Sequence, residues 1–522
     1  MKLSLFLPAA ISAGLFVAAP VWANPADIVP RGHIAYDLLG SFAGAGRLPG
    51  MTLADFFRGD RLYTRAEMAA FVATLTIQTG DENERWAAME RLLRAEFAPE
   101  LAQLGKSEYA NSGRPARLPG YTGEAKARLL TSPGAGTGTY RVSGVLPFGR
   151  DGFAAVLASN YRDEWYTTRR LGAGRGGYPT IETAYARQNG RVFDVTLGRL
   201  PLRLGPGYEG GLLVSDEART PLQARVEKTF RLPGSLKRAG VFGFMQVYGQ
   251  FWEDEEPTAD PEARGTRKHL AVRRLETAGT GRFQVALTEA YKSTRLPDFV
   301  WSQVLPFYQY QNDWTKESKH RTLNFLVTDP IQSTRWLNYL GDANVVYRTG
   351  KRGLLLYADL LLDDVKAPRG IGQNTVTARK VGQQYGVYAP NLDGANRVGA
   401  RLEVTSLDPL TYTNISAPIT WSNDGLPLGH PAGPNALSVF GRVDARFNPR
   451  VRVALEGTAR RRRTSNPAAP QPTTGERAGL YATYNLAPNT FTGFRIEHER
   501  VTPFGGSRRN NTRVELNFGA GL

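Results

Sequence analysis

Four arginines at alternate positions are the residues of this sequence whose type and spacing most suggest binding chemistry. They are Arg442, Arg446, Arg452 and Arg460, within residues 435–463. Apolar residues hold most of the odd positions between them, and successive side chains of a strand point to opposite faces. Each run therefore predicts a strand with one apolar face and one charged face. Guanidinium groups bind carboxylate and phosphate oxygens through paired N–H donors, so the charged face could hold acidic sugars or line an anion pore.

A second candidate binding group is a cluster of aromatic residues between two predicted strands, 281–290 and 321–328. Its members are Trp301, Tyr308, Tyr310 and Trp314. Aromatic rings with polar neighbours suit sugar rings. The same composition also suits a long outer loop that packs into the mouth of a barrel, and both interpretations stay open.

Catalytic chemistry finds little support in the sequence. A lipid hydrolase of the outer membrane would need a histidine and a serine closely spaced on one strand, so that the base can deprotonate the hydroxyl. None of the five histidines has a serine at the second position after it. The acidic run at 253–256 lacks the spacing of a calcium loop, and the glycine-rich run at 172–177 lacks the context of a nucleotide loop. We therefore predict a protein that is not an enzyme, with no cofactor and no metal site.

The elements that must position the arginines are long strands with a period of two. After Asn448-Pro449 the alternation restarts, which predicts a hairpin. Each run has about ten residues, the length that a tilted strand needs to cross a bilayer. Similar runs recur to residue 518 and include one at 410–420, whereas 363–394 contains none. Alternating short and long connections complete the pattern, so we predict an all-β, antiparallel transmembrane outer-membrane β-barrel of about 18 strands over residues 139–522.

Composition and targeting features agree with export to a Gram-negative cell envelope. Residues 1–23 combine Lys2, an apolar run and a Val-Trp-Ala site, which predicts a cleaved signal peptide. No later stretch offers about 18 unbroken apolar residues, so no helical span is expected. The chain has no cysteine and a formal net charge of +17. Behind a signal peptide, that charge points to acidic polysaccharide and outer-membrane lipid as partners, and not to nucleic acid.

Residues 24–105 are predicted to form a periplasmic α-helical domain, with helices beginning near Ile34 and Thr64 and a third from about Glu82 to Leu104. Thr64 and Glu67 have capping-box spacing. Residues 106–138, rich in Gly, Pro, Ser and Arg, are predicted to be a linker. The stretch with Tyr36, Gly46-Arg47-Leu48, Phe57–Asp60 and Thr64-Arg65-Ala66-Glu67 resembles a single S-layer homology module. That resemblance implies contact with a cell-wall polymer.

Several stretches of the strand region resemble the Wzi-type capsule-assembly family of outer-membrane proteins. They are Leu204–Ser215, Pro221–Gly240, Leu360–Asp364 and the loop Gly425–Pro434. The resemblance implies a barrel of eighteen strands with a periplasmic helical bundle, and a role in holding capsular polysaccharide at the cell surface. We therefore expect a non-enzymatic, polysaccharide-binding outer-membrane protein. The alternative is a porin for small anionic solutes that carries the S-layer-homology module.

Overall fold

The structure of the full chain is a computed structural model. The residues that the structure describes are 29, 34–44, 47–48, 63, 65–75, 83–104, 120–130, 136–148, 152–159, 180–188, 192–200, 202–215, 221–231, 241–251, 268–277, 282–294, 337–349, 354–363, 380–393, 397–414, 420–423, 426–448, 450–462, 473–487, 490–502 and 508–521.

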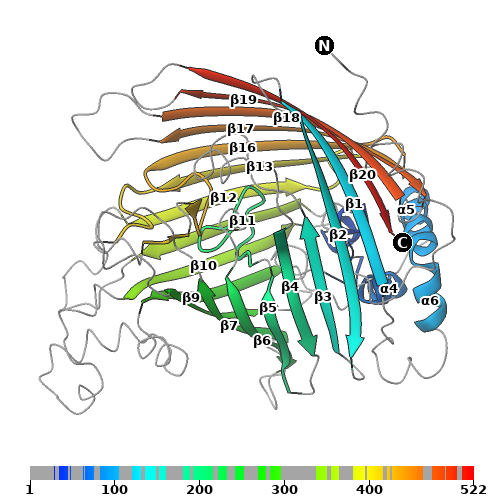
Figure 1. The fold of residues 1–522 in the computed structure, drawn as a ribbon, viewed down its shortest axis with the longest axis horizontal. Helices are drawn as coiled ribbons and strands as arrows, with labels where there is room; N and C mark the ends of the chain where they lie inside the picture. The colour runs from blue at the N-terminus through cyan, green and yellow to red at the C-terminus, as the bar shows by residue number, and fades with distance from the viewer. Residues whose placement is uncertain are drawn as a thin grey trace, which may run out of the picture.

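One large antiparallel sheet of 18 strands dominates the molecule (Figure 1). Its strands are β1 (Gly120–Leu130), β2 (Gly136–Phe148), β3 (Gly152–Ser159), β4 (Thr180–Gln188), β5 (Asp194–Arg199), β6 (Leu222–Arg231), β7 (Val241–Phe251), β8 (Lys268–Thr277), β9 (Phe283–Ser293), β10 (Leu337–Thr349), β11 (Leu354–Asp363), β12 (Val381–Ala389), β13 (Val398–Leu407), β16 (Ala436–Arg446), β17 (Val451–Arg462), β18 (Thr473–Ala487), β19 (Thr490–Thr502) and β20 (Arg509–Gly521). Two short strands, β14 (Ser422–Asn423) and β15 (Leu426–Pro427), pair separately.

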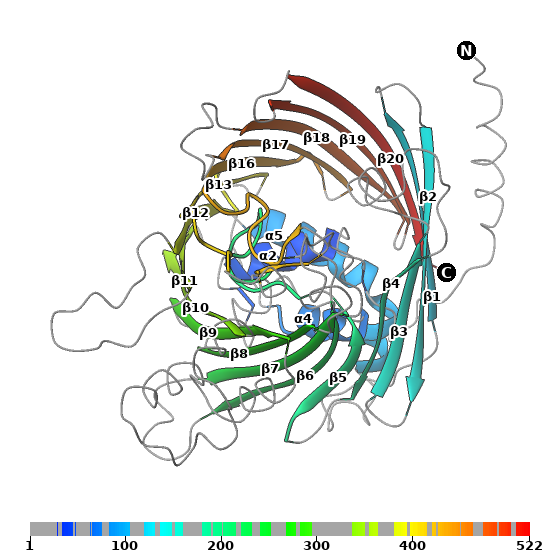
Figure 2. The same cartoon turned by 60° about the vertical axis from the view of Figure 1, so that its left-hand side comes forward.

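Each strand of the large sheet pairs with the next one along the chain, and β1 also pairs with β20. The sheet therefore curls back on itself, and Figure 2 shows the strands surrounding an interior. We call the side that faces this interior the inner face. The predicted hairpin after residue 446 is confirmed, because β16 and β17 pair from Ala436 with Arg462 to Arg446 with Arg452.

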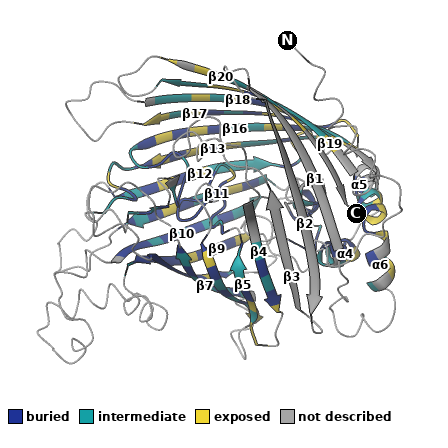
Figure 3. Cartoon of the chain, viewed as in Figure 1, coloured by how far each residue is buried: buried dark blue, intermediate teal, exposed yellow. Residues whose placement is uncertain are grey.

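Burial alternates along the strands, as the residue pattern predicts (Figure 3). On β16 the even positions other than the half-buried Arg442, including Ser438, Phe440 and Asp444, are buried, and the odd positions Leu437 and Val443 are exposed. The same outward apolar pattern recurs on many strands, in Leu197, Phe230, Leu275, Val285, Leu287, Leu356, Leu360, Leu402, Val404, Leu455, Leu480 and Leu516. The outer face of the sheet is thus largely apolar, and the inner face carries many of the polar and charged side chains.

The two ends of the sheet differ in the length of the connections between strands. At one end the connections run from the two residues between β18 and β19 to the nine between β6 and β7. At the other end they reach 43 residues between β9 and β10. The N-terminal helices lie at the short-connection end (Figure 1). There Arg446 donates from Nη2 to the hydroxyl of Ser41 at 3.0 Å, which ties β16 to a helix.

The described helices are α2 (Ile34–Gly44), α4 (Arg65–Ala73), α5 (Asn83–Glu96) and α6 (Ala98–Leu104). The predicted single third helix is divided at Phe97, because Pro99 fits the first turn of a new helix but not a helix interior. A shared core that includes Leu38, Met68 and Trp86 packs the helices together. No described helix is long and apolar enough to cross a membrane.

Three segment predictions differ from the structure. Residues 106–138 are not wholly a linker, because β1 occupies Gly120–Leu130 within them; its glycines and charged residues obscured the alternation. Strand β12 was missed because its inner face presents Gln384 next to glycines. In the predicted strand 410–420, the described residues Leu410–Asn414 form a turn and its end, with Tyr412 at a φ of 69°. The predicted strand 321–328 lies outside the described residues.

Candidate functional site

The four predicted arginines point to the inner side of the sheet, but each has a polar partner there. Arg442 donates to Asp444 at 2.9 Å and to Glu456 at 2.9 Å. Arg452 donates to the same Asp444 at 2.5 Å. Arg460 bonds an inner carboxylate, described below, and Arg446 bonds the helix residue Ser41. The expectation of a basic interior needs correction, because neighbouring carboxylates neutralise most of this charge.

A glycine-rich segment between β5 and β6 lies inside the curled sheet. We call residues 202–215 the inner segment; in Figure 1 it lies in front of the strands β11 and β12. Glycines permit its close packing: a Cβ on Gly211 would stand 1.8 Å from the carbonyl oxygen of Leu204. The segment closes on itself through a bridge between Leu204 and Val214. Such a compact fold presents the polar tip residues, Tyr208 and Glu209, to the sheet.

A second inward stretch, the described residues of 408–435, holds the inner segment in place. We call it the inner loop. Trp421 donates from Nε1 to the carbonyl of Leu213 at 2.6 Å, and the hydroxyl of Tyr412 donates to the carbonyl of Leu212. The Ser215 backbone N–H donates to the carbonyl of Leu428 at 2.6 Å. The two stretches are thereby joined through backbone groups that would otherwise be buried without partners.

These two stretches and the inner face of the sheet share one apolar core. Its members are Leu202, Leu204, Leu212, Leu213 and Val214 of the inner segment; Tyr412, Trp421, Leu428 and Ala432 of the inner loop; and Met245, Val247, Phe251, Leu270, Val272, Ala290, Leu340, Leu361, Leu407 and Ala436 of the strands. Trp421 is fully buried there. The interior beside β7–β11, β13 and β16 is therefore occupied by packed side chains and not by a wide aqueous channel.

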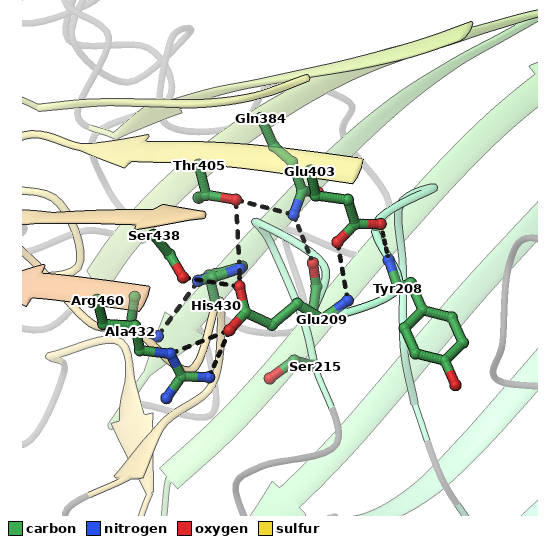
Figure 4. Close-up of polar contacts among 12 residues, drawn as sticks. Tyr208, Glu209, Ser215, Gln384, Glu403, Thr405, His430, Ala432, Ser438 and Arg460 are labelled. Atoms are coloured by element: carbon green, nitrogen blue, oxygen red, sulfur yellow. Dashed lines mark hydrogen bonds and ion pairs between the residues drawn. The ribbon is translucent and has the colours of Figure 1, made fainter. Parts of the chain in front are cut away.

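Glu403 on β13 anchors the tip of the inner segment (Figure 4). Its carboxylate accepts the backbone N–H of Tyr208 at 2.5 Å and that of Glu209 at 2.9 Å. It also accepts the hydroxyl of Tyr357. Glu403 is almost completely buried, so these donors replace the water that a buried carboxylate needs.

Glu209 continues the network toward β16, β17 and the inner loop (Figure 4). Its carboxylate accepts from Arg460 at 2.7 Å and from Ser438 at 2.8 Å, and lies 3.4 Å from Nε2 of His430. Burial alone would raise the pKa of Glu209, but the hydrogen bond from His430 and the charge of Arg460 outweigh it. The pKa falls from its ordinary 4.5 to about 2. His430 itself is fully buried and accepts the N–H of Ala432 at Nδ1, which fits a structural role.

The lowered pKa of Glu209 predicts how the inner segment responds to acid. A depressed pKa stabilises the native state above pH 4.5, and this contribution disappears as the pH falls through about 2. The full shift corresponds to about 3 kcal/mol. Glu209→Gln should therefore lose about this stability at neutral pH and lose its dependence on pH between 4.5 and 2. The rate of protease cleavage within the inner segment, recorded as a function of pH, measures this stability. Parallel pH curves for wild type and variant would contradict the lowered pKa of Glu209.

Other predicted site residues have different outcomes. Trp301, Tyr308, Tyr310, Trp314 and Thr64 lie outside the described residues, as does the side chain of Ala66. Arg65 is buried and paired inside the helical unit with Glu96 and Glu100, at 2.7 Å each. Glu67, in the first turn of α4, is half-buried. Across the described ranges, no group of three or more His, Asp or Glu side chains could hold a metal ion.

Sequence reasoning missed the residues that connect the inner segment to the sheet. Glu209, Glu403 and Trp421 did not stand out by type or spacing. The available signal was the run Gly205-Pro-Gly-Tyr-Glu-Gly-Gly211, which entered only through a resemblance. A run so rich in glycine allows close packing of backbone against other groups, but its partners lie about 200 positions away in the chain.

No protein-family model and no curated protein sequence matches this chain. Solved structures do match its fold. Wzi of Escherichia coli, an outer-membrane protein involved in group 1 capsule assembly and described as a carbohydrate-binding β-barrel, is 12% identical with a TM-score of 0.62; the match covers 94% of this chain and 99% of that one. OccK3 (OpdO) of Pseudomonas aeruginosa is 10% identical with a TM-score of 0.45, over 77% of this chain and 95% of that one. OpdL of the same organism is 11% identical with a TM-score of 0.44, over 77% and 98%. The match to Wzi shows that the chain shares the fold of an outer-membrane β-barrel.

Proposed function

We propose that this chain is a non-enzymatic, eighteen-stranded transmembrane barrel of the outer membrane that holds capsular or other surface polysaccharide at the cell surface. The apolar outer face supports the membrane location, because a soluble protein of this size would cover so large an apolar surface. Residues 1–23 would direct export. The helical unit of residues 24–105 would then face the periplasm, at the end with short connections.

The observation that carries the functional part is the packed interior. The inner segment and the inner loop fill the space beside β7–β11, β13 and β16 with an apolar core. A pore-forming barrel needs a wet lumen, whereas a barrel that holds polymer does not. The structural likeness to Wzi, whose description includes carbohydrate binding, is consistent with the proposal but reaches only the fold at 12% identity.

The alternative, a porin for small anionic solutes, rests on the net charge of +17. The pairing of Arg442 with Asp444 and Glu456, and of Arg460 with Glu209, weakens the porin interpretation. Paired charges attract anions poorly. Contact between the Thr64–Glu67 stretch and a cell-wall polymer stays a proposal; it would have to use residues other than Arg65, which is buried.

Electrical recording in planar bilayers separates the two functions. We expect the purified full-length protein to insert without a large, steady conductance, because the inner segment and inner loop occupy the interior. A steady, large, anion-selective conductance would contradict the proposed function and favour the porin. Folding of the purified protein is verified by a heat-modifiable shift on gel electrophoresis, and its insertion by co-flotation with lipid vesicles.

A further inference from the structure

One line of directly paired residues crosses the inner face of six adjacent strands. Direct cross-strand pairs join Tyr388 to Arg401, Arg401 to Arg442, Arg442 to Glu456, Glu456 to Gly479, and Gly479 to Glu497. Directly paired residues lie on one face of a sheet. Since adjacent strands are about 4.8 Å apart, the line extends over about 24 Å around the inner face. That length matches several sugar units of an extended polymer.

Gly479 in this line makes room for the ring of Tyr481, two residues further along β18. A Cβ on Gly479 would stand 2.8 Å from Cε2 and 3.0 Å from the hydroxyl oxygen of Tyr481. The ring therefore leans over the backbone of β18 toward Gly479. The Tyr481 hydroxyl donates to Glu456 at 3.2 Å, which fixes that orientation. An aromatic ring held in this way can offer a face for stacking.

Two guanidinium groups flank Tyr481. Those of Arg442 and Arg495 lie 5.8 Å and 4.8 Å from the ring centroid. The side chain of Arg495 is 27% exposed and that of Arg477, on the same strand as Tyr481, is 31% exposed. Because both point to the inner side, this exposure is toward the interior. Donor groups beside Tyr481 can therefore reach a ligand there.

Tyr208 of the inner segment supplies a second aromatic ring next to the same line. Its ring lies 4.7 Å from the Arg401 guanidinium, 5.1 Å from that of Arg442, and stacks on Phe440 at 5.5 Å. Arg401 and Arg442 are cross-strand partners, so the ring rests against one wall. Tyr208 is nevertheless 39% exposed. Its accessible surface must face the interior, on the same side as Tyr481.

The charges around Tyr481 nearly cancel. We call Tyr481 and the ion-pair network beside it the wall patch; its charged members are Arg442, Arg452, Arg477, Arg495, Asp444, Glu456 and Glu497. Arg442 pairs with Asp444 and Glu456, and Arg452 pairs with the same Asp444. Arg477 lies 3.6 Å from Glu456 and 3.8 Å from Glu497, and Arg495 pairs with Glu497. Four cations therefore share three carboxylates. Fixed ion pairs offer donors and acceptors to hydroxyl groups but attract an anion only weakly.

We infer that the wall patch binds an uncharged sugar ring, which stacks on Tyr481 and bonds its hydroxyls to the paired arginines and carboxylates. The inference rests on the proposed function and sharpens it: within a surface polysaccharide, this site recognises neutral units and not the acidic ones. Tyr208, beside Arg401 and Arg442, extends the site toward the inner segment. Other parts of the protein can still contact acidic units.

The test measures the binding of a neutral hexaglucoside and of a hexameric polyuronate to the detergent-solubilised full chain by calorimetry. We expect the wild type to prefer the neutral oligosaccharide. Tyr481→Leu should weaken that binding by about fivefold to tenfold, the value of one aromatic contact. Tyr481→Phe keeps the ring and should stay within about twofold of wild type. Tyr208→Leu provides a second loss variant on a different element.

Tyr385→Leu is the matched control, because Tyr385 is 54% exposed but projects from the outer face of β12. It should bind the neutral oligosaccharide like wild type. Glu456→Gln adds one further positive charge to the balance of the wall patch and should raise polyuronate affinity by about fivefold. Every variant must show the heat-modifiable gel shift of the folded sheet.

Three results would overturn the inference. They are a wild-type preference for the polyuronate, unchanged binding in both Tyr481→Leu and Tyr208→Leu, and no binding of the neutral hexaglucoside. If the protein still retains whole surface polysaccharide in any of these cases, the proposed function stands and only the wall patch is wrong. If it retains no polysaccharide at all, the proposed function fails as well.

Discussion

Replacing Arg65 by methionine is expected to unfold the helical unit while leaving the strands intact. The Arg65 guanidinium bonds Glu96 and Glu100 at 2.7 Å each and lies 4.8 Å from the ring centroid of Phe97. Burial alone would lower the pKa of Arg65, but the two carboxylates outweigh it and raise the pKa above its ordinary value. The substitution leaves two buried carboxylates without their cation, which costs about 3–5 kcal/mol.

That loss is comparable with the whole stability of a small helical unit. Thermal melting followed by the helical circular-dichroism signal, with gel shift as a monitor of the strands, measures it. Arg94→Met is the matched control, because the Arg94–Glu90 pair is partly exposed and should contribute only about 0.5 kcal/mol. Adding Glu96→Gln and Glu100→Gln to Arg65→Met should restore part of the stability. Equal melting of Arg65→Met and Arg94→Met would contradict the buried network.

The second large effect is expected from Trp421→Ala, which removes the centre of the interior core. Trp421 is fully buried and donates from Nε1 to the carbonyl of Leu213 at 2.6 Å. Loss of a buried tryptophan side chain costs about 3–5 kcal/mol through lost burial and the remaining cavity. The inner segment should then separate from the inner loop. Protease cleavage within residues 202–215 and a rise in bilayer conductance are the expected observations.

Trp421→Phe separates packing from hydrogen bonding. It keeps most of the apolar volume and removes the N–H donor, leaving the carbonyl of Leu213 unsatisfied at a cost of about 1–2 kcal/mol. It should therefore resist protease better than Trp421→Ala. If Trp421→Ala is as protease-resistant and as non-conducting as wild type, the core around Trp421 does not keep the interior occupied.

Period-two alternation made much of the sheet predictable from the sequence. The hairpin of β16 and β17 follows from alternating apolar residues interrupted at Asn448-Pro449. Because the outer face of the whole sheet is largely apolar, the alternation repeats in most of its strands. Where inner and outer residues are both small or polar, as in β12 with Gly382, Gln383 and Gln384, that contrast vanishes and the strand cannot be seen.

The candidate site was less predictable, because its contacts join distant parts of the chain. Alternation placed Arg442 and Arg460 on the charged face but could not show what lies opposite them. The carboxylate that pairs with Arg460 is Glu209, which is 251 positions away. Arg442 meets Asp444 and Glu456 only once β16 and β17 are in register. Three of the four predicted arginines, Arg442, Arg452 and Arg460, thus pair with carboxylates, and only the fold could reveal these pairs.

The most direct test of the central claim is retention of the full-length protein on a column of immobilised polysaccharide taken from the surface of the cells that make it. The account predicts retention that soluble polysaccharide competes away, by a folded protein that conducts no steady current in a bilayer. Passage through the column without delay, by protein that shows the gel shift of an intact barrel, would contradict it.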